Sequence, residues 1–188
     1  MNKVKLLSDG FFGLDKGFLV YRKTSYHGVL YMAALKPLLI TTDKEKILVD
    51  TGIGELPDRI KKFYRLDREM KLERSIKEEG LKPEDISVVI NTHLHLDHCG
   101  NNVLFKNAKF YVQRDEVRYA HFPDRFQKNT YIRELFDTVD YIGIKGDHEI
   151  TGGVKVITTP GHSPAHQSVV VDTEDEKYIY CGDASPLR

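Results

Sequence analysis

Short apolar runs separated by polar turns dominate the first third of the chain and predict strands. The runs are rich in branched and aromatic residues, as strands are, and they cover residues 4–7, 18–21, 30–40 and 46–50. Residues 43–46 are polar and lie between two of these runs, which predicts a hairpin turn. Residues 47–49 are continuously apolar, which is typical of a strand covered on both faces.

A helical pattern follows the strands. From Leu66 to Glu79 the apolar residues recur at spacings near four among many charged residues. Asp67 is the expected N-cap and Gly80 the expected C-terminal stop. Residues 86–90 then form an apolar run that ends in a histidine-rich loop. This order of strand, helix and strand puts the loop at the carboxyl end of a strand, where sites collect in layered α/β folds.

The second half of the chain continues the alternation of strands and helices. A helix is expected over residues 115–121, partial helix within 123–137, and strands over 109–112, 141–144, 154–158, 167–171 and 178–181. The sequence has no tandem repeat, low-complexity tract or linker. Residues 1–188 are therefore expected to form a single domain.

The composition is that of an ordinary globular protein, with 40% hydrophobic and 30% charged residues. The number of Lys and Arg residues equals the number of Asp and Glu residues, at 28 each, so the sequence lacks the excess of basic residues that is typical of a nucleic-acid-binding protein. Two cysteines, Cys99 and Cys181, argue against a disulfide scaffold and favour a reducing compartment. No targeting segment is visible, and the longest apolar run, residues 29–35, is too short to span a membrane. We expect a cytoplasmic protein without nucleic-acid or membrane partners.

Four potential metal ligands lie within six residues, in the pattern His-x-His-x-Asp-His formed by His93, His95, Asp97 and His98. Imidazole and carboxylate groups suit zinc, iron and manganese. In an extended backbone the first three side chains would share one side, and a turn would then bring His98 to the same region. Four donors this close can hold one metal and begin a second site. The alternative is a strand end whose histidines are satisfied within the core.

Two more candidate ligands follow later predicted strands. His162 lies in the loop of residues 159–166, where proline and glycine fix an irregular backbone that can aim a side chain. Asp183 comes shortly after the strand predicted at 178–181, and a carboxylate has two oxygens that can bridge two cations.

The order of these motifs resembles that of the metallo-β-lactamase superfamily. The resemblance includes His-x-His-x-Asp-His at 93–98, Thr-Pro-Gly-His ending at His162, Gly-Asp-Ala-Ser around Asp183 and Val-Asp-Thr-Gly at 49–52. Within the superfamily the sequence is most similar to the N-acyl homoserine lactone lactonases. That similarity lies in residues 161–168 and 183–185.

The resemblance implies the α+β class, as a four-layered αββα sandwich with a dinuclear site at one edge. Two divalent ions are expected, with zinc favoured and iron or manganese as alternatives. The implied ligands are His93, His95, Asp97, His98, His162 and Asp183.

These ligands divide between the two ions in the family pattern. His93, His95 and His162 would hold one ion, and Asp97 and His98 the other, with Asp183 as the bridge. Asp50 would orient ligands from outside the coordination shell, and His166 would support the site without binding metal.

Two departures from the family pattern affect the expectation. The family supplies another histidine ligand well beyond the bridging aspartate, whereas this sequence ends at Arg188, so the C-terminal portion of the fold is expected to be missing. The lactonases also place a substrate-binding tyrosine where this sequence has Pro186.

The expected function is that of a metal-dependent hydrolase that opens a lactone or related ester, with an N-acyl homoserine lactone as the specific candidate. A metal-bound hydroxide would attack the carbonyl carbon, and Asp97 would pass a proton to the leaving alkoxide. One alternative is a thioester hydrolase of the hydroxyacylglutathione hydrolase type. Another is a non-catalytic metal-binding domain or inactive fragment, which Pro186 favours. The expected partner is a small lactone or ester, and the oligomeric state is left open, with a dimer as one option.

Overall fold

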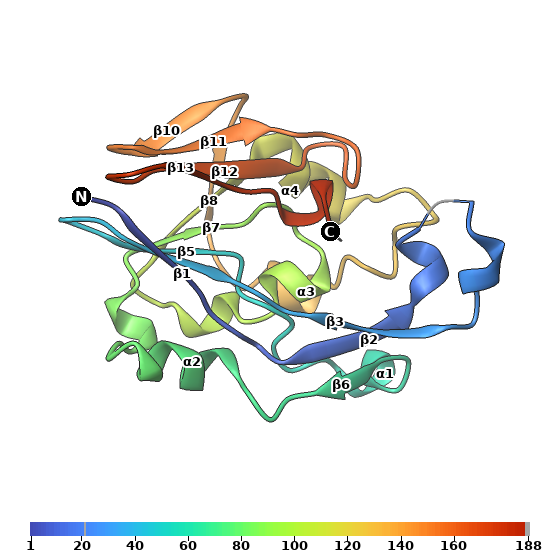
Figure 1. Cartoon of the computed structure of the whole chain (residues 1–188). Helices are drawn as coiled ribbons and strands as arrows, with labels where there is room; N and C mark the ends of the chain where they lie inside the picture. The colour runs from blue at the N-terminus through green and yellow to red at the C-terminus, as the bar shows by residue number, and fades with distance from the viewer. Residues whose placement is uncertain (21, 187–188) are drawn as a thin grey trace.

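The computed structural model describes residues 1–20 and 22–186, whose strands form three sheets (Figure 1). The largest sheet contains, in spatial order, β1 (Lys3–Leu6), β4 (Leu38–Thr41), β5 (Lys46–Val49), β7 (Val88–Ile90), β8 (Lys109–Gln113) and β9 (Tyr141–Ile144). A second sheet contains β10 (His148–Thr151), β11 (Val154–Thr158), β12 (Gln167–Asp172) and β13 (Lys177–Tyr180). A small third sheet contains β3 (Leu30–Ala34), β2 (Phe11–Asp15) and β6 (Arg65–Asp67).

The helices are short and lie between the strands in the sequence. They are α1 (Asp58–Lys61), α2 (Leu72–Glu78), α3 (Leu96–Cys99), α4 (Arg114–His121) and α5 (Arg133–Phe136). Within the described part of the chain, no helix is long and apolar enough to cross a membrane. The mixture of sheets and helices gives the α+β class that the sequence predicts.

Strands β5, β7, β8 and β9 are parallel neighbours, which places their carboxyl ends at one edge of the sheet. The predicted strand, helix, strand unit is confirmed as β5, α2 and β7, and β4 pairs with β5 as the predicted hairpin. Parallel strands need a crossover connection, and the helices supply it. The loops after these strands are therefore brought together whatever their separation in sequence.

The two larger sheets stack face to face, with α2 on the opposite face of the six-stranded sheet (Figure 1). Ile47 and Val49 of β5 face the four-stranded sheet, whereas Leu48 between them faces α2. All three side chains are fully buried, which confirms the prediction of a strand covered on both faces. The side chains that fill the space between the sheets include Leu38, Ile40, Val88, Ile90, Val154, Val156, Val169 and Val171.

The helix predicted from Leu66 to Glu79 is shorter than expected. Residues Arg65–Asp67 form strand β6, and α2 begins at Leu72, so the predicted N-cap at Asp67 is wrong. The helical spacing of apolar residues does not decide the structure of residues 65–67, because they pair as a strand with β2, which lies more than fifty positions earlier in the chain. Gly80 follows the helix with a positive φ of 75°, as expected of a C-terminal stop.

Two of the strand predictions also need correction, and the strands β2 and β10 were not predicted at all. The strand predicted at 18–21 is absent from its described residues, and the short 3-10 helix Lys16–Phe18 occupies its start. Residue 21 lies outside the described residues. The run at 30–40 splits into β3 and β4, which belong to different sheets. Strand β10, whose residues are mostly polar, was not predicted.

A buried carboxylate ties the amino-terminal segment to the rest of the fold. Asp9 is completely buried and accepts hydrogen bonds from Leu72 N at the start of α2, from Ile53 N and from Asn101 Nδ2, at 2.8–3.0 Å. It also pairs with Arg68, with Nη2 at 2.8 Å from Oδ1. Asp9 thus joins three segments that are distant in sequence.

Replacing Asp9 with Asn is expected to lower the free energy of unfolding by about 3–5 kcal/mol, because the Arg68 charge, only 14% exposed, loses its counter-ion. Urea unfolding followed by circular dichroism measures this change. The exposed Asp140→Asn substitution is the matched control and should leave the value unaltered. Equal stability of the two variants would show that the Asp9–Arg68 pair contributes nothing net.

Candidate metal centre

The candidate site forms where strand ends of the two stacked sheets meet. Asp50 follows β5, and residues 91–95 follow β7. From the other sheet come the loop of residues 159–166 after β11 and the turn after β13 that carries Asp183. Gln167 joins the two sheets, since its backbone N–H donates to Thr92 O and its side-chain amide donates to Asn91 O.

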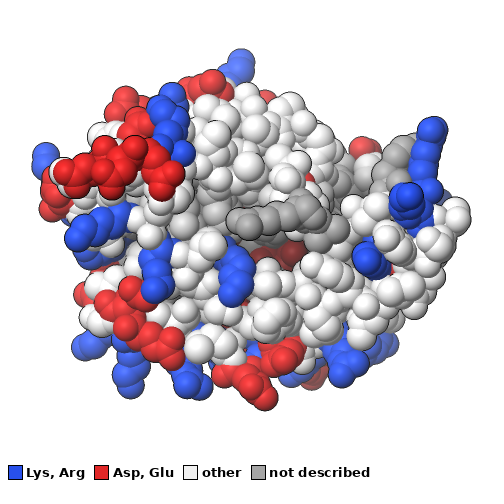
Figure 2. All heavy atoms as spheres, in the orientation of Figure 1, with Lys and Arg blue, Asp and Glu red and all other residues white. Residues whose placement is uncertain are grey.

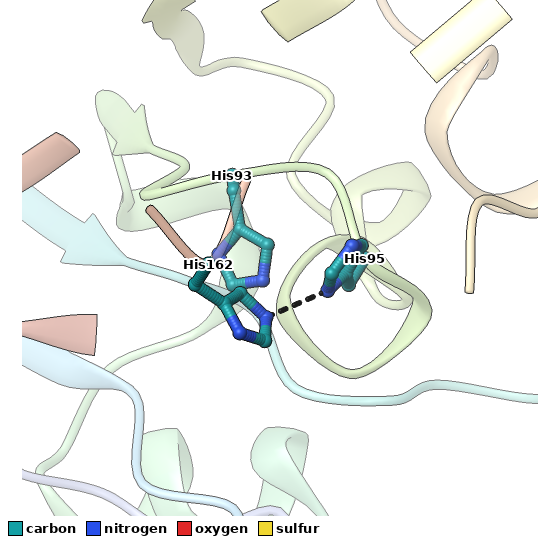
Figure 3. A group of neighbouring side chains, drawn as sticks. All are labelled: His93, His95 and His162. Carbon is teal, nitrogen blue, oxygen red and sulfur yellow. Dashed lines mark hydrogen bonds between the residues drawn. The ribbon is translucent and has the colours of Figure 1, made fainter. Parts of the chain in front are cut away.

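Three histidines converge in the first group of candidate ligands. One nitrogen each from His93, His95 and His162 lies within 4.8 Å of the others. Figure 3 shows the three rings turned toward one another, with His162 Nε2 2.9 Å from His95 Nδ1. The rings of His93 and His95 come from the loop after β7, and His162 comes from the loop after β11.

A second group shares one member with the first. His93, His98 and Asp183 also offer atoms within 4.8 Å of one another. Asp183 lies between the groups, because Oδ1 is 3.4 Å from His98 Nε2 and Oδ2 is 3.2 Å from His162 Nε2. Asp183 thus contacts a histidine of each group.

Asp97 lies beside the second group without belonging to either. Its Oδ2 is 3.6 Å from His98 Nε2, and its side chain is 19% exposed. The expected extended alternation through Asp97 is wrong, because helix α3 begins at Leu96. The helical turn brings Asp97 and His98 to the site together. The structure therefore gathers five of the six predicted ligands into two groups and places the sixth at their margin.

Asp50 hydrogen-bonds to His98 and Thr92 of the site without joining either group of candidate ligands, which is the arrangement predicted for a residue that orients ligands. Its Oδ2 is 2.8 Å from His98 Nδ1, which leaves Nε2 of that ring facing the site. Its carboxylate also accepts bonds from the N–H and the hydroxyl of Thr92, next to His93. Asp50 has a positive φ of 58°, an uncommon conformation for a residue other than glycine. Backbone strain of this kind persists where surrounding contacts fix it, often at functional sites.

His166 supports the loop that carries His162. Its Nδ1 is 2.8 Å from Thr159 Oγ1, and its Nε2 accepts the backbone N–H of Asp183 at 3.2 Å. Both ring nitrogens are thus engaged by the protein, which agrees with the predicted supporting role. Gly182 has a positive φ of 52°, and a Cβ there would lie 2.9 Å from His166 Nε2.

The two cysteines take no part in either group. Cys99 is fully buried, its Sγ contacts the carbonyl oxygens of Leu94 and His95, and burial raises its pKa well above the ordinary value. It packs in the core as a thiol. Cys181 is half-buried and lies just after β13, so the strand predicted at 178–181 ends one residue earlier than expected.

The electrostatics of the site suit cation binding. Burial lowers the pKa values of His93, His95 and His162, and neighbouring imidazoles lower them further, although Asp183 opposes the shift for His95 and His162; these three rings are therefore neutral at neutral pH. Burial also raises the pKa of Asp97 to about 6, against the opposing effect of His98. Burial opposes the charge of Asp183 too, but His98 and His162 hold its pKa below the ordinary range.

Buried nitrogen atoms without partners show that the residues fit a metal. Among the described residues, His93 Nε2 and His95 Nε2 have no hydrogen-bond partner although both are buried. Leaving such an atom unpaired costs free energy unless another group satisfies it. Neutral imidazoles beside carboxylates are the donor set of zinc, iron and manganese sites.

Stacked sheets with histidine and aspartate side chains gathered at one edge are the arrangement that the sequence resemblance implies. The chain belongs to the metallo-beta-lactamase superfamily, whose family model matches residues 37–188. The predicted family and fold class are thus confirmed.

Curated relatives narrow the comparison to lactonases. The N-acyl homoserine lactonase of Bacillus cereus is 34% identical over 147 residues, which cover 72% of this chain and 57% of that protein. The N-acyl homoserine lactonase AttM of Rhizobium radiobacter is 39% identical over 124 residues, which cover 60% of this chain and 46% of that protein. The chain thus spans about half the length of the curated relatives it matches.

Solved structures agree with the fold. AiiA from Bacillus thuringiensis, as a variant with N-decanoyl-L-homoserine at its active site, superposes with a TM-score of 0.78 at 30% identity, covering 92% of this chain and 71% of that one. A probable metal-dependent hydrolase from Staphylococcus aureus has a TM-score of 0.86 at 24% identity, covering 96% of this chain and 72% of that one. The second likeness concerns the fold alone.

Proposed function

We propose that this chain carries the metal centre of a hydrolase that opens lactones, with N-acyl homoserine lactones as its substrates. The observation that carries the proposal is that two groups of candidate ligands share His93 and that Asp183 contacts one further histidine of each group, His98 and His162. These residues would be enough to hold two cations, with Asp183 available to both.

The lactonase relatives support the choice of substrate class. A solved N-acyl homoserine lactone hydrolase, 30% identical and superposed with a TM-score of 0.80, has the product N-hexanoyl-L-homoserine bound at its catalytic metal centre. The alignment covers 92% of this chain.

The ligands proposed for the first cation are His93, His95 and His162, and those for the second are His98 and Asp97, with Asp183 shared. Divalent cations there would supply Lewis acidity toward the carbonyl oxygen and would lower the pKa of a bound water. Zinc is the proposed ion, with iron and manganese compatible with the same donors.

Asp97 is the proposed acid and base. Its carboxylate is partly exposed at the margin of the site, where it can meet both a water molecule and the substrate. As the water oxygen bonds to the carbonyl carbon, Asp97 takes a proton from the water. When the ring C–O bond breaks, Asp97 delivers that proton to the leaving alkoxide.

Surface charge places no strong constraint on the substrate. Figure 2 shows Lys and Arg interspersed with Asp and Glu on the face it presents. A small, largely uncharged lactone suits such a surface as well as an anion would.

The proposal is tested by metal analysis and by hydrolysis assays on the same preparation. Elemental analysis is expected to find two metal ions per chain, and N-hexanoyl-L-homoserine lactone is expected to be opened, with release of acid followed by a pH indicator. A thioester and a β-lactam in the same assay distinguish the alternative hydrolases. Bound metal without turnover of any compound would support a non-catalytic metal-binding domain and would refute the lactonase proposal.

A further inference from the structure

One buried carboxylate near the site has no place in the chemistry proposed above. Glu116 lies in the first turn of α4, is 0% exposed and has no salt-bridge partner among the described residues. Burying an isolated carboxylate is costly unless hydrogen bonds compensate for the lost water. The groups that bond to Glu116 therefore indicate what the residue does.

The first pair of partners belongs to the segment that contains His93 and His95. The backbone N–H of Leu94, between those two histidines, donates to Glu116 Oε1 at 3.0 Å. The hydroxyl of Tyr131 donates to the same oxygen at 2.9 Å. The Tyr131 ring packs edge-on against His95, with 4.5 Å between ring centroids. Oε1 thus fixes both the backbone before His95 and a ring that contacts it.

The second pair of partners belongs to the loop that contains His162. The Ser163 hydroxyl donates to Glu116 Oε2 at 2.7 Å, and the backbone N–H of Ala165 also bonds to the carboxylate. Ser163 is 1% exposed, so this bond is shielded from water. One carboxylate therefore spans the two loops, which come from different sheets.

We infer that Glu116 is a positioning residue that locks the His93–His95 segment to the His162 loop and so preassembles the three-histidine site. The inference rests on the proposed metal-binding function, and it concerns a residue that binds neither metal nor substrate. Groups behind the coordination shell commonly alter metal affinity about 10–100-fold, because they fix the ligands in place.

The chemistry of the partners makes Glu116→Gln an informative variant. A glutamine has one accepting oxygen and one donating amide, whereas two of the four partners are backbone N–H groups that can only donate. The hydroxyls of Tyr131 and Ser163 can rotate to accept the amide, but Leu94 N–H cannot, so it loses its acceptor when the amide takes the place of Oε1, and the Ser163 bond must reverse when the amide takes the place of Oε2. Glutamine therefore keeps the shape of the side chain but removes the negative charge that both loops contact, which weakens the link between them.

The test is a Zn²⁺ titration of metal-free protein against a chromophoric chelator. Glu116→Gln is expected to weaken the tighter Zn²⁺ site about 10–100-fold, and Ser163→Ala is expected to weaken it less, in the same direction. The exposed Glu149→Gln on β10 is the control and should bind as the wild type does. Thermal unfolding of the metal-free variants is recorded in parallel, because a purely structural residue would lower stability without changing the Zn²⁺ affinity of the folded protein.

Hydrogen exchange supplies a second readout that needs no activity. The amides of Leu94 and Ala165 are expected to be protected in the wild type, and one of them should exchange faster in Glu116→Gln. Wild-type Zn²⁺ affinity in both Glu116→Gln and Ser163→Ala would overturn the inference. Failure of the wild type itself to bind Zn²⁺ would instead refute the proposed metal centre, so the two failures are distinguishable.

Discussion

Replacing Asp97 with Asn is expected to lower the turnover of N-hexanoyl-L-homoserine lactone by about 10²–10⁴-fold, the usual contribution of a positioned acid or base. Asparagine keeps an oxygen at the margin of the second group but cannot take up and return a proton. Most bound metal should remain, because asparagine keeps an oxygen that can still bind the second cation and the three-histidine group proposed for the first cation does not include Asp97. Steady-state assays with elemental analysis of the same sample measure both quantities.

The control for this variant is Asp175→Asn, which changes an exposed carboxylate in the turn between β12 and β13. It should leave both turnover and metal content at wild-type values. Full activity of Asp97→Asn would refute the proton-transfer role. Loss of the metal together with activity would instead assign Asp97 to coordination as its main task.

Removal of metal is expected to abolish hydrolysis and to lower the midpoint of thermal unfolding by about 5–10 °C. A ligand present at one hundred times its dissociation constant stabilises the folded state by about 2.7 kcal/mol, and each kcal/mol shifts the midpoint by about 2–4 °C in a chain of this size. The physical reason is that His93 and His95 carry buried nitrogens without partners, while Asp183 and Asp97 repel each other across the site. Dialysis against a chelator, followed by scanning calorimetry with and without added Zn²⁺, measures the shift.

The His162→Ala variant tests whether the stabilising cation binds at the three-histidine group, because it removes one member of that group. Its unfolding midpoint should respond little to added Zn²⁺. The exposed His148→Ala substitution on β10 should preserve the full response. A Zn²⁺ response in His162→Ala equal to that of the wild type would show that the cation binds elsewhere.

The parts of the site that could be predicted are those encoded by close spacing. His93, His95 and His98 lie within six residues, so any compact backbone keeps them near one another. The positions of Asp50 and His162 after the ends of strands could be predicted, because an apolar run precedes each of them. Even here the local geometry differed from expectation, since α3 begins within the motif and turns Asp97 away from the alternation of an extended chain.

Glu116 could not be found from the sequence. It lies in a helix rich in charged residues, where glutamate is normally a solvated surface group. Its burial results from the packing of α4 beneath two loops that belong to different sheets. The burial and contacts of Asp9 could not be predicted for the same reason, because its partners Ile53, Leu72 and Asn101 are all more than forty positions away in the sequence.

The sequence by itself determined which candidate metal ligands this protein carries and most of its strands, because ligand identity and hydrophobic periodicity are local properties. Only the tertiary structure decided that Asp183 lies between two groups of histidines and that Arg65–Asp67 forms a strand instead of a helical turn. These outcomes depend on contacts between segments that are distant in the chain. The energies of such contacts outweigh local conformational preferences, and they cannot be inferred from the spacing of residues in the sequence.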